Sequence, residues 1–179
     1  MAPIVRALRC ADWCETTLCH TGQHQHLVAP LLPELDLTPD VELCCERSDP
    51  SLGSLTATLL RDLSRLIGDG RHDWVLVQGD TASAYAGGLA AFYHGLPVGH
   101  VEAGLRTPDR RRPFPEELHR RMLAQIADLH FAPTASAART LKGEGHSTHD
   151  VSVTGNTAID SLRWLLERHP LPPAPVDAP

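Results

Sequence analysis

Two carboxylates and one amide follow apolar runs that have the composition of buried strands, and a third carboxylate stands at the start of a helical pattern. Asp80 comes directly after WVLVQG, Glu102 follows PVGHV, and Asn156 follows VSVTG. Glu116 opens a helical pattern after the loop that leaves Glu102. Ligands of open parallel sheets bind beyond the carboxyl ends of the strands, so we expect these side chains to gather at one edge. A carboxylate there can take or give a proton if burial or neighbouring charge adjusts its pKa.

Most of these residues also have a structural interpretation. Asp80 or Thr81 can cap the helix that follows. Glu116 and Glu117 come after Pro115, which suits a helix start where the dipole favours acids. For these positions the sequence leaves both interpretations open.

Glu102 is less easily explained by structure alone, because a carboxylate at the end of a buried strand requires a partner or a chemical role. We expect Arg106 or Arg120 to be that partner. The three arginines at residues 110–112 fit a solvated loop better than a binding site.

A metal site is the alternative for the N-terminal segment CADWCETTLCHTGQHQH. It holds three cysteines and three histidines, residue types that bind zinc. Cys10 and Cys14 are expected to share a helix face, but the spacings match no compact finger or ribbon. We therefore expect no metal and interpret the cysteines as small apolar residues. The odd total of five cysteines does not indicate a disulfide framework.

The elements that would position these side chains alternate along the chain. Strand-like apolar runs lie at residues 16–22, 41–45, 74–80, 97–103, 129–134 and 151–156. Helical patterns lie in APIVRALR at the start and at residues 54–68, 81–95, 115–127, 135–145 and 156–169. The strand runs are nearly continuous in apolar residues, as in parallel sheets covered on both faces. This alternation predicts a doubly wound α/β fold.

The composition is that of a soluble globular protein. The chain has 179 residues, 42% hydrophobic and 21% charged, which is enough for one domain with a buried core. The formal charge of −6 argues against nucleic acid as the main partner. No apolar run reaches the ~20 residues of a membrane span, and the start does not resemble a signal peptide, so we expect no membrane association and a cytoplasmic location. We interpret HPLPPAPVDAP at residues 169–179 as a stiff linker after a domain at residues 1–168.

Six strings together resemble one family. They are TGQH at 21–24, GDT at 79–81, GLPVGHVEAGLRT at 95–107, PFPEE at 113–117, DLHFAPT at 128–134 and VTGNTAID at 153–160. In order and spacing they are similar to the non-hydrolysing UDP-N-acetylglucosamine 2-epimerases. The resemblance implies a Rossmann-like doubly wound domain, one of two in a GT-B-like architecture whose active site lies between the domains. It also implies interconversion of UDP-GlcNAc and UDP-ManNAc, for which we expect no cofactor.

In that family, UDP is eliminated across C1 and C2 of the sugar and adds back while C2 is protonated on the opposite face. The resemblance implies that Asp80, Glu102 and Glu116 are the catalytic carboxylates, which act on the C2 proton and stabilise positive charge at C1. It implies that Arg120 is a substrate-binding residue that holds an acid or a phosphate.

Three further positions bear on regulation or depart from the family pattern. Gln23 matches a position that contacts a second UDP-GlcNAc, acting as an activator, in some bacterial members. His26 stands where glutamine is often found. His119 stands where asparagine is usual.

The family pattern extends beyond this sequence at both ends. The resemblance implies that the first strand with its GTRPE-like turn and the whole C-terminal domain are missing here. We therefore expect a truncated or split epimerase that is inactive alone, with a separate C-terminal domain chain as a partner and a homodimer as the complete form. A non-catalytic interaction or regulatory remnant of the family is the alternative, and a different enzyme of the glycosyltransferase kind is a third interpretation.

Overall fold

The structure is a computed structural model that describes residues 1–169. Two compact units can be distinguished. The larger unit comprises Cys19–Gln23 and Glu42–Gly155, and the smaller one comprises Met1–Leu18, His24–Val41 and the residues from Asn156 onward. The linker predicted from the proline-rich tail lies, apart from its first residue, outside the described residues. Its boundary with the preceding domain stays a prediction.

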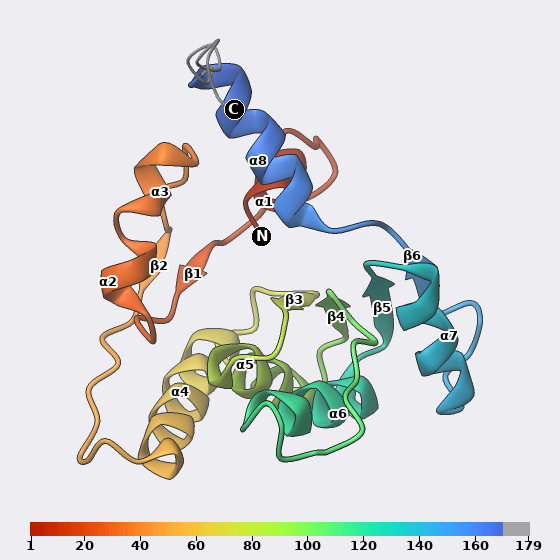
Figure 1. The fold of residues 1–179 in the computed structure, drawn as a ribbon. Coiled ribbons are helices and arrows are strands. Elements are labelled where there is room, and N and C mark those ends of the chain that lie inside the picture. The colour runs from red at the N-terminus through yellow and green to blue at the C-terminus, as the bar shows by residue number, and fades with distance from the viewer. Residues whose placement is uncertain (170–179) are drawn as a thin grey trace, which may run out of the picture. The chain divides into compact units, whose positions relative to one another are not determined.

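The larger unit is an α/β fold built on a four-stranded parallel sheet (Figure 1). Its strands, in spatial order, are β3 (Val75–Gln78), β4 (Val98–Val101), β5 (Leu129–Ala132) and β6 (Val151–Val153). Its helices are α4 (Leu52–Ile67), α5 (Ala82–Tyr93), α6 (Glu116–Ile126) and α7 (Ala135–Gly143). The predicted strands and helices in this part of the sequence are confirmed, and so is the parallel α/β sheet.

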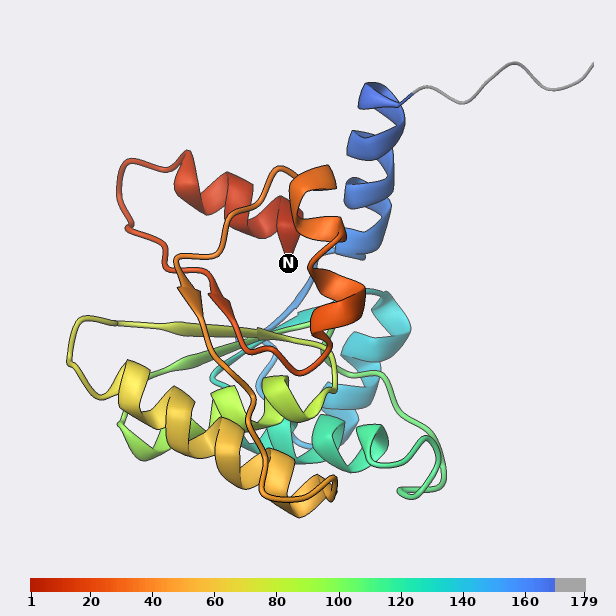
Figure 2. The same ribbon diagram turned by 90° about the vertical axis from the view of Figure 1, so that its left-hand side faces the viewer.

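The connections between these strands follow one pattern. Each of the parallel strands β3, β4 and β5 is joined to its neighbour through a helix, and right-handed crossovers of this kind place successive helices on one face. Figure 2 shows α4, α5 and α6 together on one face of the sheet. Helix α7 packs against β5 and β6. Because all four strands are parallel, their carboxyl ends share one edge of the sheet, and the loops that follow the strands can meet there.

Helix α5 lies at the centre of the core of the larger unit. It contacts α4, α6 and strand β3, and it is apolar on all sides, as expected for a helix packed on several faces. Small residues allow this close packing. A Cβ atom added at Gly88 would lie 2.7 Å from Leu123 Cδ2, so α6 packs directly on the glycine.

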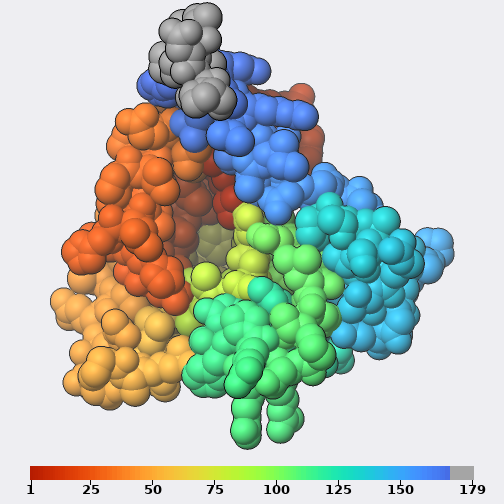
Figure 3. All heavy atoms as spheres, viewed as in Figure 1, coloured from red at the N-terminus to blue at the C-terminus, as the bar shows by residue number. Residues whose placement is uncertain are grey.

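The smaller unit contains α1 (Ala2–Arg9), α2 (Gln25–Val28), α3 (Leu31–Glu34) and α8 (Thr157–Arg168). Helices α1 and α8 pack together, and the guanidinium groups of Arg6 and Arg168 lie 4.2 and 4.1 Å from the centroid of the Trp164 ring. Helix α8, blue in Figure 3, carries the exposed apolar side chains Ile159 and Leu162. Helices α1 and α8 were predicted, whereas α3 was not, because a single turn is too short for a hydrophobic period to emerge.

Two short strands pair outside the parallel sheet. Strands β1 (Cys19–His20) and β2 (Val41–Glu42) form a two-stranded sheet of their own. The strands predicted at residues 16–22 and 41–45 are therefore shorter than expected and do not join the parallel sheet. Both runs mix polar with apolar residues, which favours a short ladder over a buried strand.

Candidate active site

The carboxyl ends of β3 and β4 bring Asp80 and Glu102 to the same edge of the sheet. The strands are parallel neighbours, with Gln78 opposite Val101. Asp80 follows β3 after one glycine, and Glu102 follows β4 directly. Gln78 donates a hydrogen bond from Nε2 to Glu102 Oε2 at 3.3 Å. A polar side chain at the end of β3 therefore orients the acid at the end of β4.

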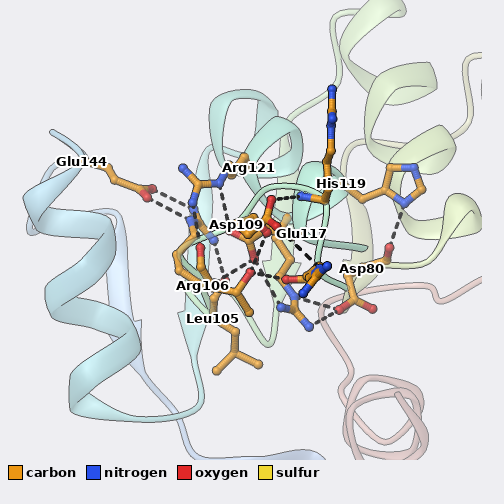
Figure 4. Close-up of polar contacts among 12 residues, drawn as sticks. Asp80, Leu105, Arg106, Asp109, Glu117, His119, Arg121 and Glu144 are labelled. Atoms are coloured by element: carbon orange, nitrogen blue, oxygen red, sulfur yellow. Dashed lines mark hydrogen bonds and ion pairs between the residues drawn. The ribbon is translucent and has the colours of Figure 1, made fainter. Parts of the chain in front are cut away.

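Asp80 is held by two consecutive residues of α6. Arg120 donates from Nε to Asp80 Oδ2 at 2.8 Å, and its Nη2 lies 2.6 Å from the same oxygen. His119 Nδ1 lies 2.8 Å from the main-chain oxygen of Asp80, as Figure 4 shows. A carbonyl oxygen can only accept, so this ring nitrogen carries the proton. Helix α6 thus holds both the carboxylate and the main chain of Asp80.

Glu117 is the buried anion of this site, with a relative exposure of 0%. Its Oε1 accepts from Arg121 Nε at 2.8 Å, and its Oε2 accepts from the Thr107 N–H at 3.1 Å (Figure 4). Arg120 Nη1 also donates to Glu117 Oε2, at 3.3 Å. A carboxylate can be buried only with such partners. The network fastens the loop that leaves β4 to the first turns of α6.

The prediction that Arg106 or Arg120 pairs with Glu102 is wrong. Arg106 donates to both carboxylate oxygens of Glu144, at 2.9 and 2.7 Å, because its loop runs past the C-terminal end of α7. Arg120 is occupied by Asp80 and Glu117. The partner of Glu102 in the described residues is the amide of Gln78.

Glu117 was missed as a site residue by sequence reasoning, which treated it only as an acid at a helix start. One signal could have identified it. Glu117 stands three residues before Arg120 and four before Arg121, the spacings at which helical side chains meet. An acid followed at these spacings by two arginines indicates an ion-pair network on one face of the helix.

The backbone of Glu102 is in the left-handed region, with φ of 66°. A non-glycine residue pays about 1–2 kcal/mol there, and such residues cluster at functional sites. Gly104, two residues on, also has a positive φ of 88°. A Cβ atom at Gly104 would lie 2.4 Å from Ala137 O, so the loop can pass α7 only as glycine. The strained backbone of Glu102 is therefore an independent indication that its carboxylate belongs to a functional site.

Glu116 is the first residue of α6 and stands one turn before Arg120. Residues four apart in a helix lie on the same face. Arg120 contacts Asp80, so Glu116 lies on the face of α6 that meets the end of β3. The roles predicted for Asp80, Glu102, Glu116 and Arg120 in catalysis and substrate binding stay predictions.

Gln23 caps the first turn of α5. Its Oε1 accepts from Ser83 N at 2.9 Å and from Ser83 Oγ at 2.6 Å. Thr81 is the N-cap residue of the same helix, as one of the structural interpretations predicted. Effector binding by Gln23 stays a prediction. Asn156, the fourth polar residue expected at the sheet edge, caps α8 in the smaller unit, and its expected place at the edge also stays a prediction.

Two histidines on neighbouring strands are buried under the helices of the larger unit. His100 on β4 and His130 on β5 are opposite each other in the register, with exposures of 0% and 1%. His100 Nε2 donates to Gly79 O at 2.8 Å. Burial lowers the pKa of His100, and burial together with His146 and His100 lowers the pKa of His130 to about 4.

The arginines at 110–112 are exposed, as predicted for a solvated loop. Helix α1 ends before Cys10, so Cys10 and Cys14 do not share a helix face, contrary to expectation. Among residues 1–169, no group of three or more metal-binding side chains could hold an ion. No helix in this part of the chain is long and apolar enough to cross a bilayer.

Comparison with known proteins identifies relatives over almost the whole chain. Residues 6–174 match a family model described as UDP-N-acetylglucosamine 2-epimerase. The UDP-N-acetylglucosamine 2-epimerase of Bacillus subtilis is 44% identical over 162 residues, which cover 90% of this chain and 43% of the relative. The enzyme of that name from Escherichia coli K12 is 38% identical over 168 residues, or 94% of this chain and 45% of the relative. The chain therefore spans less than half the length of these relatives.

Solved structures agree. The UDP-GlcNAc 2-epimerase of Neisseria meningitidis bound to UDP-GlcNAc matches with a TM-score of 0.90 and 38% identity, over 94% of this chain and 45% of that one. The Methanocaldococcus jannaschii enzyme in complex with UDP-GlcNAc and UDP matches with a TM-score of 0.86 and 34% identity, over 93% of this chain and 46% of that one. These matches confirm the predicted Rossmann-like α/β fold of GT-B-like type.

Proposed function

Because the chain belongs to the UDP-N-acetylglucosamine 2-epimerase family, we propose that it is the N-terminal Rossmann-like part, residues 1–168, of an enzyme that interconverts UDP-GlcNAc and UDP-ManNAc. Residues 169–179 would lead to a second domain. The observation that carries the proposal is the ion pair of Arg120 with Asp80 at the end of β3, beside the strained Glu102 at the end of β4.

The proposed reaction proceeds by elimination and re-addition. A base removes the proton from C2 while the bond from C1 to the diphosphate oxygen breaks, which leaves UDP and a C1–C2 double bond. An acid then protonates C2 on the opposite face, and the diphosphate oxygen adds back to C1. Both directions need carboxylates near the ring, and the charge that develops at C1 needs a fixed anion.

Three acids of this edge are assigned to that work: Asp80, Glu102 and Glu116. Arg120 fixes the direction of the Asp80 carboxylate and supplies positive charge near the place where a diphosphate would leave. Glu102 accepts from the neutral Gln78 amide, and among residues 1–169 no salt bridge pairs its carboxylate with an arginine or lysine. Which acid serves which face of C2 is left open by this assignment.

The proposal also covers partners and location. Its ligands are UDP-GlcNAc and UDP-ManNAc, and its missing half is a C-terminal domain on a continuing or separate chain. The complete form is a homodimer. Binding of an effector at Gln23 would have to compete with Ser83 for the Gln23 oxygen. A cytoplasmic location fits the five free thiols, which suit a reducing compartment.

Proton exchange at C2 tests the function. Residues 1–168 are exchanged into the matching segment of the Bacillus subtilis relative, so that the rest of that protein supplies what this chain does not. The chimera and the 179-residue chain are incubated with UDP-GlcNAc in deuterated water, and deuterium at C2 is followed by NMR. The proposal is supported if the chimera incorporates deuterium at C2 and its E102Q variant does not. A folded chimera that binds UDP but exchanges nothing would favour the non-catalytic alternative.

A further inference from the structure

The turn between β3 and α5 carries Asp80, and both main-chain carbonyls at this point are bonded to imidazole rings. His100 Nε2 lies 2.8 Å from Gly79 O, and His119 Nδ1 lies 2.8 Å from Asp80 O. Each carbonyl accepts, so each ring nitrogen donates its proton. The two rings come from different elements, His100 from β4 and His119 from α6. The peptide that carries Asp80 is therefore held from two sides.

The two donors are themselves fixed in place. His100 and His119 have exposures of only 0% and 5%. The ring of His119 stacks on Tyr85 of α5, with centroids 5.1 Å apart and planes 8° from parallel. A ring packed in this way cannot swing away from the carbonyl without breaking the stack. The bond to Asp80 is therefore a stiff link between α6 and the turn.

The next residue of α6 completes the arrangement. Arg120 binds the Asp80 carboxylate, while His119 binds the Asp80 carbonyl. The side chain of Asp80 can rotate about its own bonds or move with its peptide, and these two contacts restrict both motions. The Nδ1 nitrogen of His119 is used in the bond to the Asp80 carbonyl, so through this nitrogen His119 acts on Asp80.

We propose that His119, supported by His100, is a positioning residue that aims the Asp80 carboxylate at the reacting sugar. We call the two bonds from His119 and His100 to the carbonyls of Asp80 and Gly79 the clamp. The inference rests on the proposed function for the role of Asp80, whereas the clamp itself is present in this chain whatever its function. Reactivity is sensitive to such aiming, since a misplacement of about 1 Å in an active site can cost roughly 100-fold in rate.

A pair of substitutions separates the hydrogen bond from the packing. In H119N the amide nitrogen stands two bonds from Cβ, as Nδ1 does in histidine, so a donor is kept while the ring is lost. In H119F the ring can still stack on Tyr85, but the Asp80 carbonyl loses its donor. A clamp predicts that H119N behaves like the wild type and H119F does not. A role in packing alone predicts the reverse order.

The first measurement uses the 179-residue chain and needs no activity. The Nε–H signal of Arg120 is observed by ¹⁵N NMR of arginine-labelled protein and assigned by its loss in R120K. We expect its exchange with water to be similar in the wild type and H119N and about tenfold faster in H119F, because the Asp80 partner moves. Equal exchange in all three proteins, or loss of protection in H119N alone, overturns the clamp.

The second measurement uses the chimera. H119F is expected to lower kcat by roughly 10- to 100-fold with little change in KM, and H119N to restore most of it. L123A is the matched control, because Leu123 is a buried residue of α6 that packs on Gly88 of α5. If L123A reproduces the kcat loss of H119F at an equal loss of thermal stability, the positioning role is refuted. If the wild-type chimera turns nothing over, the proposed function fails, and the NMR comparison still decides on the clamp.

Discussion

Arg120 and Asp80 form a one-sided ion pair, in which Nε and Nη2 of the arginine both contact the single oxygen Oδ2. The third guanidinium nitrogen, Nη1, lies 3.3 Å from Glu117 Oε2. One cation therefore joins an acid whose side chain is 25% exposed to one that is fully buried. Only a planar group with several donors can serve two carboxylates in this way.

Replacing Arg120 with lysine tests this bridge. Lysine keeps the charge but lacks the planar fork in which Nε and Nη2 contact Asp80 while Nη1 contacts Glu117. We expect R120K to lower C2 exchange in the chimera by roughly 10- to 100-fold, because Asp80 loses its fixed direction. The control is R121K, since Arg121 contacts Glu117 and Thr107 but not Asp80. Equal losses in the two variants would count against a special role for the Asp80 contact.

Glu117 is predicted to matter for folding more than for chemistry. E117Q leaves Arg120 and Arg121 without their buried anion, and breaking a buried ion pair costs about 3–5 kcal/mol. Urea unfolding of the 179-residue chain measures this loss. E116Q is the matched control, because the neighbouring acid is not fully buried, and surface substitutions usually change stability by less than about 0.5 kcal/mol. A similar loss in both variants would show that the network contributes little.

The sequence was sufficient to place the acids at the ends of the strands. Asp80 and Glu102 follow apolar runs, and a parallel sheet brings the carboxyl ends of such runs to one edge. Helix starts were equally visible, since Thr81 and the acids after Pro115 fit the preferences of a first turn. Apolar strand runs and helix-start residues depend on neighbours in the sequence, so they can be read without knowledge of the tertiary fold.

The contacts between segments could not be predicted in the same way. Glu116 and Glu117 are adjacent acids at one helix start, and only the path of the loop that leaves β4 decides that Glu117 is buried beside Thr107. Arg106 is one of the two arginines expected to pair with Glu102, but it lies against Glu144, which is 38 residues beyond Arg106 in the chain. Such pairings depend on three-dimensional packing, which the order of residue types does not specify.

The left-handed backbone of Glu102 predicts an order of stabilities among variants that lack the carboxylate. E102G and E102A both remove the acid, but only glycine adopts a φ of 66° without steric cost. We expect E102G to be more stable than E102A by about 1 kcal/mol in urea unfolding, and neither variant to support C2 exchange in the chimera. If E102A were the more stable variant, the strain assigned to this position would be absent in solution.

The buried histidines predict a loss of stability in mild acid. The pKa of His130 is about 4 in the folded chain against 6.5 for an ordinary histidine, because burial and the neighbouring His146 and His100 disfavour its charged form. Between these two values the unfolded chain binds a proton that the folded chain does not. The stability that neutral His130 contributes is therefore fully present above pH 6.5 and is lost as the pH falls from 6.5 toward 4; below pH 4 nothing further is lost from this group. The total loss is about 1.4 kcal/mol for each unit by which the folded pKa lies below the unfolded pKa.

Substitution of His130 checks this assignment, provided that the other charges around it are kept. Asp150 opposes the shift and Arg106 adds to it, so both must stay in place. We expect the free energy of unfolding of H130L, measured in urea, to fall less than that of the wild type between pH 6.5 and 4. Some slope remains, because the pKa of His100 is also lowered by burial. H149Q, at an exposed position, serves as the control and should retain the wild-type slope. A wild-type slope in H130L would mean that His130 is not the group that resists protonation, and that the acid sensitivity of the fold arises elsewhere.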